Sequence, residues 1–254
     1  MGDEYAEYYD SDTGSTDDLP FYLEYANRHG SPILELACGT GRLLVPMAEA
    51  GHTVHGIDIS GGMLDRCTQK ISERGLDGRA EVSKANMSEF DLPVKDYSMV
   101  FVAFRSFMHL FSQVDQLSCL QCVRDHLKQD GVLIVDVYAP LFHLLVHEKD
   151  EDFVLRREFD LPNGNRGKRF DRFLRGDVAN QLQRSELRFE ELSPSGAMIK
   201  ETVVPLTTRY TFPFEMRLLM EKAGFEVAAM YRDYDKHPYD GTGEMIVVAS
   251  RRQV

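Results

Sequence analysis

The chain has 254 residues, a mass of 29.0 kDa and a formal net charge of −12 at pH 7. This length suits one large α/β domain with an insertion, or two small domains. The acidic balance disfavours broad contact with nucleic acid phosphates, so a small molecule or a peptide is the expected partner. No run of about 18 apolar residues occurs, so the sequence predicts no membrane span.

Cysteine usage and the first residues indicate the cellular setting. The four cysteines, at positions 38, 67, 119 and 122, show no spacing typical of a disulfide framework. The chain begins acidic and rich in tyrosine, whereas a secretory signal begins basic and continues apolar. Both observations favour a reducing cytoplasm. Cys119, Cys122 and His126 share a helical face without a second pair of ligands, so we interpret them as packing residues and predict no metal.

Two segments precede the first predicted strand. The first eighteen residues combine acids with Tyr5, Tyr8 and Tyr9, a composition that favours a frayed acidic arm. Asp18 is the expected cap of a helix that has Pro20 in its first turn and ends at a glycine.

The stretch from Pro32 to Ser60 organises the rest of the sequence. Its pattern predicts a strand over 33–37, a glycine turn, a helix and a second strand over 53–58 that ends in an acid. Gly39 and Gly41 let the backbone come close to a ligand, and the helix that follows offers unpaired N–H groups. Asp58 is placed to accept hydrogen bonds from two ribose hydroxyls. The stretch therefore predicts a site for a ribose-bearing cofactor.

Two residues disfavour a dinucleotide in this site. Leu44 stands where the phosphate-binding fingerprint has its third glycine, and Glu35 places a negative charge beside the turn. An acid there suits a cationic ligand. The run Glu35-Leu-Ala-Cys-Gly-Thr-Gly41 resembles motif I of the class I S-adenosylmethionine-dependent methyltransferases, whose cofactor carries an ammonium and a sulfonium but no phosphate.

The remaining pattern agrees with the fold that this resemblance implies. Further strands are expected over 79–85, 98–104 and 132–138, and two last strands over 226–233 and 244–251 resemble the closing antiparallel hairpin of the family. The fold class is therefore α/β: a Rossmann-like, mostly parallel seven-stranded sheet with helices on both faces and an antiparallel β-meander inserted after strand five.

The sequence also predicts a division into regions. Residues 1–30 form an N-terminal lid and helix, and residues 31–143 with 213–254 form the methyltransferase core. Residues 144–212, where charge rises and strands alternate between turn signals, form the β insertion. This insertion is expected to be a substrate roof, a homodimer interface, or both.

A second informative run follows the fourth predicted strand. Ala103 to Leu110 stands at the strand's carboxyl end, where open α/β sheets bind ligands. Position alone leaves Arg105 open as a surface ion pair and His109 as a structural histidine. The run resembles the Asn/Arg-Ser-Phe-x-His-Leu stretch of glycine/sarcosine N-methyltransferases and related small-molecule and peptide enzymes. That resemblance implies that both side chains lie near the transferred methyl group.

The family resemblance also assigns the remaining site residues. The implied catalytic groups are His109, as base or substrate anchor, Arg105, and Tyr9 in a segment that folds over the cofactor. Asn86 departs from the family's acid, although its carbonyl oxygen can still accept from the adenine amino group. The implied cofactor-binding residues are Glu35, Ala37, Gly39, Gly41, Arg42, Asp58, Ile59, Met63, Asn86, Met87 and Phe104.

The resulting expectation is an S-adenosylmethionine-dependent methyltransferase that acts on a small molecule or peptide, preferentially at an amine nitrogen. Two alternatives stay open: an O-methyltransferase, and a regulatory protein that binds the cofactor without turnover. An RNA methyltransferase is disfavoured by the acidity and by Phe104 to Phe107 standing where such enzymes have an Asn/Asp-Pro-Pro-Tyr-like motif.

Overall fold

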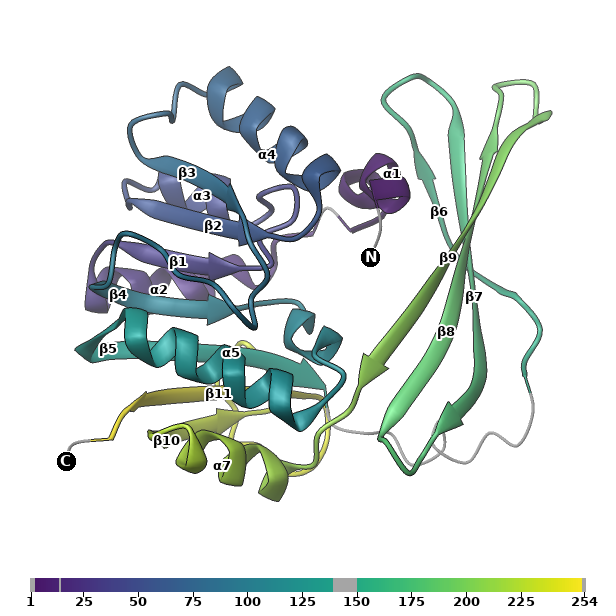
Figure 1. The fold of residues 1–254 in the computed structure, drawn as a ribbon. Helices are drawn as coiled ribbons and strands as arrows, with labels where there is room; N and C mark the ends of the chain where they lie inside the picture. Colours follow the sequence, from purple (N-terminus) through teal and green to yellow (C-terminus); the bar gives the residue numbers. More distant parts are fainter. Residues whose placement is uncertain (1–2, 14, 139–149, 253–254) are drawn as a thin grey trace. The chain divides into compact units, whose positions relative to one another are not determined.

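A computed structural model of the chain describes residues 3–13, 15–138 and 150–252. They form two compact units, each described by itself (Figure 1). The larger contains residues 16–139 and 210–254, and the smaller contains residues 1–15 and 140–209. The predicted region 1–30 is thus divided between the units. The predicted start of the insertion at residue 144 lies outside the described residues.

A seven-stranded sheet is the centre of the larger unit, with the order β10-β11-β5-β4-β1-β2-β3. The five strands β1 to β5 pair in parallel, while β11 pairs antiparallel with both β5 and β10. The strands are β1 (Ile33–Leu36), β2 (Val54–Asp58), β3 (Ala80–Lys84), β4 (Tyr97–Val102), β5 (Leu127–Tyr138), β10 (Phe225–Tyr231) and β11 (Glu244–Arg251). The predicted fold class is confirmed, down to the closing hairpin.

Helices cover both faces of this sheet. In Figure 1, α5 and α7 lie in front of the sheet and contact each other, whereas α2 lies behind it. The helices are α2 (Leu19–His29), α3 (Leu44–Glu49), α4 (Gly61–Glu73), α5 (Gln113–His126), α7 (Pro213–Lys222) and the short 3₁₀ helix η1 (Ser106–His109). Strands β1 and β4 are buried along their whole length. Their near-continuous apolar sequences follow from this burial on both faces.

The smaller unit is an antiparallel sheet in the order β6-β7-β8-β9, packed against helix α1. The elements are α1 (Asp3–Thr13), β6 (Val154–Asp160), β7 (Arg166–Asp177), β8 (Leu182–Leu192) and β9 (Met198–Arg209). The ring of Tyr8 stacks on buried Phe189 with centroids 4.8 Å apart, and Arg169 forms an ion pair with Asp12 at 2.9 Å. The frayed-arm interpretation is therefore wrong for residues 3–13, which form a helix whose Tyr5 and Tyr8 are buried.

Candidate functional site

The predicted cofactor turn follows β1 and has a left-handed backbone at three positions. Ala37, Gly39 and Gly41 have φ angles of 55°, 56° and 80°. A Cβ atom on Gly41 would stand 2.6 Å from Cys67 Sγ, so space as well as conformation requires glycine there. A Cβ on Gly39 would meet nothing within 4 Å. The turn therefore has a packed side and an open side, and the open side leaves room for a ligand.

Asp58 ties the end of β2 to this turn. Its Oδ2 accepts a hydrogen bond from the Gly39 N–H at 2.9 Å, and its Oδ1 accepts one from the Ser60 N–H at 2.8 Å. A carboxylate has about four acceptor positions, so each oxygen keeps capacity for a ribose hydroxyl. Ser60 in turn caps α4 by accepting from the Met63 N–H at 3.2 Å. This chain of bonds holds Asp58 at the open side of the turn.

Glu35 is a buried carboxyl group inside β1. Its side chain is 4% exposed, and Oε2 has no hydrogen-bonding partner among the described residues. Burial raises the pKa of this carboxyl well above its ordinary value, with Arg42 opposing the shift. A buried orphan acceptor is costly unless a ligand satisfies it. The residue therefore fits the cationic ammonium of an amino acid moiety, as its place in motif I implies.

Arg42 joins the turn to the chain before α2. It donates two hydrogen bonds to the Asp18 carboxylate, at 2.6 and 2.7 Å, and both side chains are less than a tenth exposed. Its guanidinium also lies 4.9 Å from the centroid of the Phe104 ring. Asp18 is the N-cap residue of α2, as expected, but its side chain makes no cap hydrogen bond, because the carboxylate binds Arg42 instead. Arg42 thus shapes the edge of the site by holding two other segments.

Residues that are expected to flank an adenine lie after β2 and β3. Ile59 is 63% exposed at the end of β2, while Met63 is buried and Met87 half-buried. The Asn86 Oδ1 accepts hydrogen bonds from the Ser88 N–H at 3.1 Å and from the Ser88 hydroxyl at 3.0 Å. A carbonyl oxygen has two lone pairs, so this turn already occupies both. The amino-group contact expected of Asn86 therefore requires the Ser88 bonds to rearrange.

The run after β4 starts with two residues in a left-handed conformation. Phe104 and Arg105 have φ angles of 52° and 64°, which side chains other than glycine adopt at a cost. The Arg105 guanidinium pairs with Glu244, with Nε 3.2 Å from Oε2, and lies 5.5 Å from the Tyr138 ring centroid. Arg105 therefore forms an ion pair in the structure, which is one of the two roles that its position allowed. Its role near the transferred methyl group stays a prediction.

The two other predicted catalytic residues occupy different units. His109 is the last residue of η1, half-buried beyond the carboxyl end of β4. Tyr9 belongs to α1 in the smaller unit, where its ring meets the Tyr5 ring edge-on at 5.3 Å. The placement of Tyr9 over the cofactor stays a prediction.

Asp136, near the end of β5, is the residue that the sequence reasoning missed. Its Oδ2 accepts hydrogen bonds from the Phe104 N–H at 3.0 Å and from the Tyr234 hydroxyl at 2.6 Å, and its side chain is 1% exposed. Burial, with Glu244 adding to the effect, raises its pKa to about 7. The available signal was an acid inside an otherwise apolar strand, just before the sheet edge where ligands bind.

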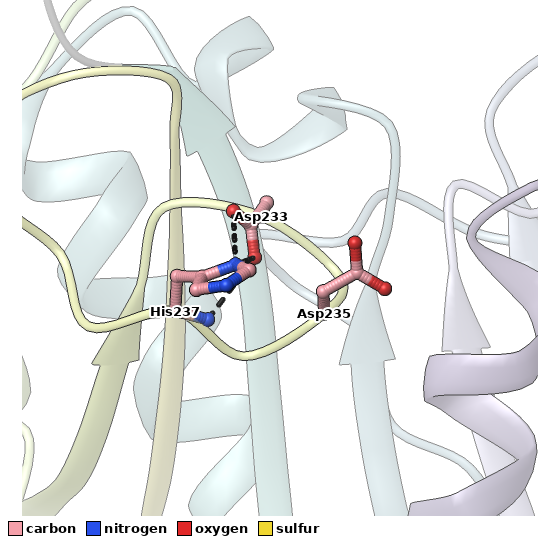
Figure 2. A group of neighbouring side chains, drawn as sticks. All are labelled: Asp233, Asp235 and His237. Carbon is pink, nitrogen blue, oxygen red and sulfur yellow. Dashed lines mark hydrogen bonds and ion pairs between the residues drawn. The ribbon is translucent and has the colours of Figure 1, made fainter.

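A group of metal-type ligands lies in the loop between β10 and β11. Asp233, Asp235 and His237 have ligand atoms within 4.8 Å of one another, the one such group found among the described residues. Figure 2 links the His237 ring only to Asp233, whose oxygens lie 3.0 and 2.9 Å from Nδ1. Arg232 also lies 3.5 Å from Asp233. His237 and Arg232 therefore already contact Asp233, which is the half-buried residue of the three.

A pocket of about 200 Å³ opens at the opposite edge of the sheet, beside the amino ends of the parallel strands. His55 and Tyr97 line it. His55 bonds the Tyr97 hydroxyl through Nδ1 at 2.7 Å and the Ser83 hydroxyl through Nε2 at 3.0 Å. Because these buried groups satisfy one another, we place the functional site at the carboxyl edge and not in this pocket.

Comparison with known proteins agrees with this geometry. Residues 33–131 match the model of a methyltransferase domain. The CcbJ methyltransferase from Streptomyces caelestis superimposes with a TM-score of 0.81 at 24% identity, over 99% of this chain and 98% of that one. CalS10, an amino pentose methyltransferase from Micromonospora echinaspora solved with S-adenosylmethionine bound, gives 0.69 at 20% identity, over 94% and 93%. The chain therefore has the fold of the class I methyltransferases, and its residues 33–131 are similar to a methyltransferase domain.

Curated sequences show the same relationship over different lengths. The glycine/sarcosine N-methyltransferase of Aphanothece halophytica is 24% identical over 87% of this chain and 77% of that protein. The putative methyltransferase YqeM of Bacillus subtilis is 32% identical over 107 residues, or 42% of each protein. The chain spans less than half the length of the first curated relatives that it matches. No helix among the described residues is long and apolar enough to cross a membrane.

Proposed function

We propose that the protein transfers a methyl group from S-adenosylmethionine to a nitrogen atom of a small molecule or peptide. The observation that carries the proposal is the orphan carboxylate of Glu35 beside the open turn at Gly39, with Asp58 facing the same turn. A buried carboxyl group that can ionise beside a cation, open backbone and an acceptor for hydroxyls fit an ammonium and a ribose together. They do not fit a pyrophosphate, whose negative charge would oppose the ionisation of Glu35.

The predicted cofactor-binding residues contact different parts of the cofactor in this proposal. Glu35 would accept from the cofactor's ammonium, Asp58 from its ribose hydroxyls, and Ile59, Met63 and Met87 would provide apolar contact to its adenine. The cofactor supplies an electrophilic methyl group on a sulfonium. Methyl transfer is a displacement in line with the leaving group, so the protein must mainly align the nucleophile and keep it unprotonated.

His109 is the proposed proton acceptor or substrate anchor. It follows β4 in η1, at the sheet edge where ligands bind. A histidine there can accept a proton from an amine near neutral pH. Replacing His109 with alanine should slow transfer while cofactor affinity stays nearly intact. An equal fall in both would make the residue structural.

Nitrogen is the preferred acceptor atom because several similar proteins are named for N-methylation. They include a sugar N-methyltransferase, a dTDP-amino sugar N,N-dimethyltransferase and a glycopeptide N-methyltransferase. The ubiquinone biosynthesis O-methyltransferase of Actinobacillus pleuropneumoniae, 26% identical over 68% of this chain, supports oxygen as the second candidate.

Two measurements test the proposal in sequence. Calorimetric titration with S-adenosylmethionine should show binding to the wild-type protein and a strong loss in Asp58→Ala. The protein is then incubated with cofactor labelled in its methyl group and with matched panels of amines and hydroxyl compounds. Label on nitrogen supports the proposal, and label confined to oxygen would replace it with the O-methyl alternative. Binding without any transfer across the panels would favour a regulatory protein.

A further inference from the structure

Asp136 connects three parts of the larger unit that are far apart in the sequence. Near the end of β5, its Oδ2 accepts from the Phe104 N–H after β4 and from the Tyr234 hydroxyl in the loop between β10 and β11. These two partners are 32 and 98 residues away in the chain. Its other oxygen, Oδ1, has no partner among the described residues. One buried oxygen thus fixes both a turn and a loop.

The turn that Asp136 fixes is strained. Phe104 and Arg105 are consecutive non-glycine residues with φ angles of 52° and 64°. Residues other than glycine adopt this conformation at a cost, so surrounding contacts must hold it. A hydrogen bond from a backbone N–H to a carboxylate is about twice as strong as a bond between neutral groups. The bond to Asp136 is therefore well suited to stabilise the strained turn.

The Phe104–Arg105 turn also shapes the edge of the cofactor site. The Phe104 side chain is 40% exposed, and its ring lies 4.9 Å from the Arg42 guanidinium in the predicted cofactor turn. Arg105 points to another partner, Glu244 of β11. A change in the backbone at Phe104 would therefore displace both a ring beside Arg42 and an ion pair.

We propose that Asp136 and Tyr234 form a latch that positions the Phe104–Arg105 turn at the edge of the cofactor site. The inference rests on the proposed function for its consequence, because the latched turn borders the predicted cofactor site. Both are positioning residues, since Asp136 is buried and acts through the Phe104 backbone.

The protonation state of Asp136 controls the strength of the latch. The charged and titratable groups that face it are Glu244 from β11, Tyr234 from the loop after β10, Arg105 from the turn after β4 and Tyr22 from α2. Burial and Glu244 raise the pKa of Asp136 to about 7, against the opposing effects of Tyr234, Arg105 and the Phe104 N–H. The carboxylate accepts strongly when ionised and weakly when protonated. The latch therefore loosens as the pH falls through about 7.

Hydrogen exchange tests the latch without the cofactor. The variants are Asp136→Asn, which keeps an acceptor but cannot ionise, and Tyr234→Phe, which loses only the hydroxyl. At pH 8 the peptide spanning 103–109 should exchange several-fold faster in both than in wild type. Tyr239→Phe, a half-buried tyrosine of the same loop, is the matched control and should exchange like wild type. Wild-type exchange in both latch variants would overturn the inference.

Cofactor titration tests the functional consequence. S-adenosylmethionine is titrated into the four proteins at pH 6 and pH 8. At pH 8 both latch variants should bind about 3-fold to 10-fold more weakly, and the wild-type affinity should fall at pH 6 by more than that of Asp136→Asn. Equal pH profiles for wild type and Asp136→Asn would overturn the protonation control. If wild type does not bind the cofactor at all, the proposed function fails, whereas the exchange result still decides the latch.

Discussion

Polar side chains are buried at both edges of the seven-stranded sheet, and the unpaired carboxylate oxygens among them lie at the carboxyl edge. Arg124 Nε, at the end of α5, is a further buried atom without a partner among the described residues. At the amino edge, both ring nitrogens of His55 have partners in Tyr97 and Ser83. At the carboxyl edge, Glu35 Oε2, Asp136 Oδ1 and the Tyr22 hydroxyl have none among the described residues. The two edges belong to the same strands, so the difference does not come from the fold alone.

This difference supports the carboxyl edge as the candidate ligand site. A buried polar atom without a hydrogen bond costs about 1–3 kcal/mol, and native proteins keep few of them. Orphan carboxylate oxygens are stabilised again when a ligand supplies the missing partners. The pocket at the amino edge has a volume of about 200 Å³, yet the buried His55 and Tyr97 that line it already satisfy one another. Unsatisfied partners are therefore a better guide here than the presence of a pocket.

The largest expected effect is the loss of cofactor affinity in Asp58→Ala. The change removes the acceptor for the Gly39 and Ser60 N–H groups as well as for the ribose hydroxyls. Unpaired groups of this kind cost about 1–3 kcal/mol, so calorimetry should show affinity for S-adenosylmethionine falling by up to about 100-fold. Asp77→Ala, an exposed acid beside the amino-edge pocket, is the control and should bind normally. Similar affinity in both variants would contradict the assignment of the carboxyl edge.

Glu35→Gln should weaken cofactor binding by about tenfold and change the pH dependence of stability. The neutral amide replaces a charge-assisted bond to the ammonium, worth about 1.5–3 kcal/mol, with a neutral one worth about 0.5–1.5 kcal/mol, so the net loss is about 1.4 kcal/mol. Burial, opposed by Arg42, raises the folded-state pKa of Glu35 above the ordinary 4.5. Between those two values the folded state holds a proton that the unfolded state has released, so wild-type stability falls as the pH rises.

Urea denaturation without cofactor at pH 5 and pH 8 measures this effect. The glutamine variant has no proton to release, so its stability relative to wild type should be greater at pH 8 than at pH 5. A difference in unfolding free energy between the variant and wild type that is constant with pH would show that the pKa of Glu35 is not raised. It would also contradict the assignment of Glu35 to the ammonium of the cofactor.

Tyr97→Phe, at the amino edge, should lower stability and leave cofactor binding unchanged. The change removes the hydroxyl that bonds His55 Nδ1 at 2.7 Å in a buried position. The free energy of unfolding should fall by about 1–2 kcal/mol, measured by urea denaturation. Affinity for S-adenosylmethionine should match wild type. A fall of tenfold or more in affinity would show that the two edges are not independent.

Asn86→Ala should have the smallest effect among the predicted cofactor-binding residues. Its Oδ1 already accepts two hydrogen bonds from Ser88, so little acceptor capacity is left for an adenine amino group. We expect the affinity measured by calorimetry to change by less than about threefold, or about 0.6 kcal/mol. A tenfold loss would mean that the Ser88 bonds rearrange on binding, and that the contact expected from the family pattern is made.

Local sequence determined the parallel core and the position of its cofactor turn. Hydrophobic runs predicted the buried strands β1 and β4, while Gly39, Gly41 and Asp58 marked the turn and its acceptor at the carboxyl edge. These features are readable because each depends on neighbouring residues, on period and on backbone conformation. Glu35 could be identified in the same way, because an acidic residue inside an apolar strand marks a candidate site residue.

Only the tertiary structure decided which distant groups meet. Asp136 touches Phe104 because β4 and β5 are adjacent in the sheet, and Tyr234 joins them from a loop 98 residues away. Likewise, the sequence predicts that the Asp18 side chain caps α2, but the carboxylate pairs with Arg42. The sequence favours a frayed arm for Tyr8, but its ring stacks on Phe189. A side chain can bind any partner that folding brings within a few ångströms, whereas local sequence shows only the partners that are near it in the chain.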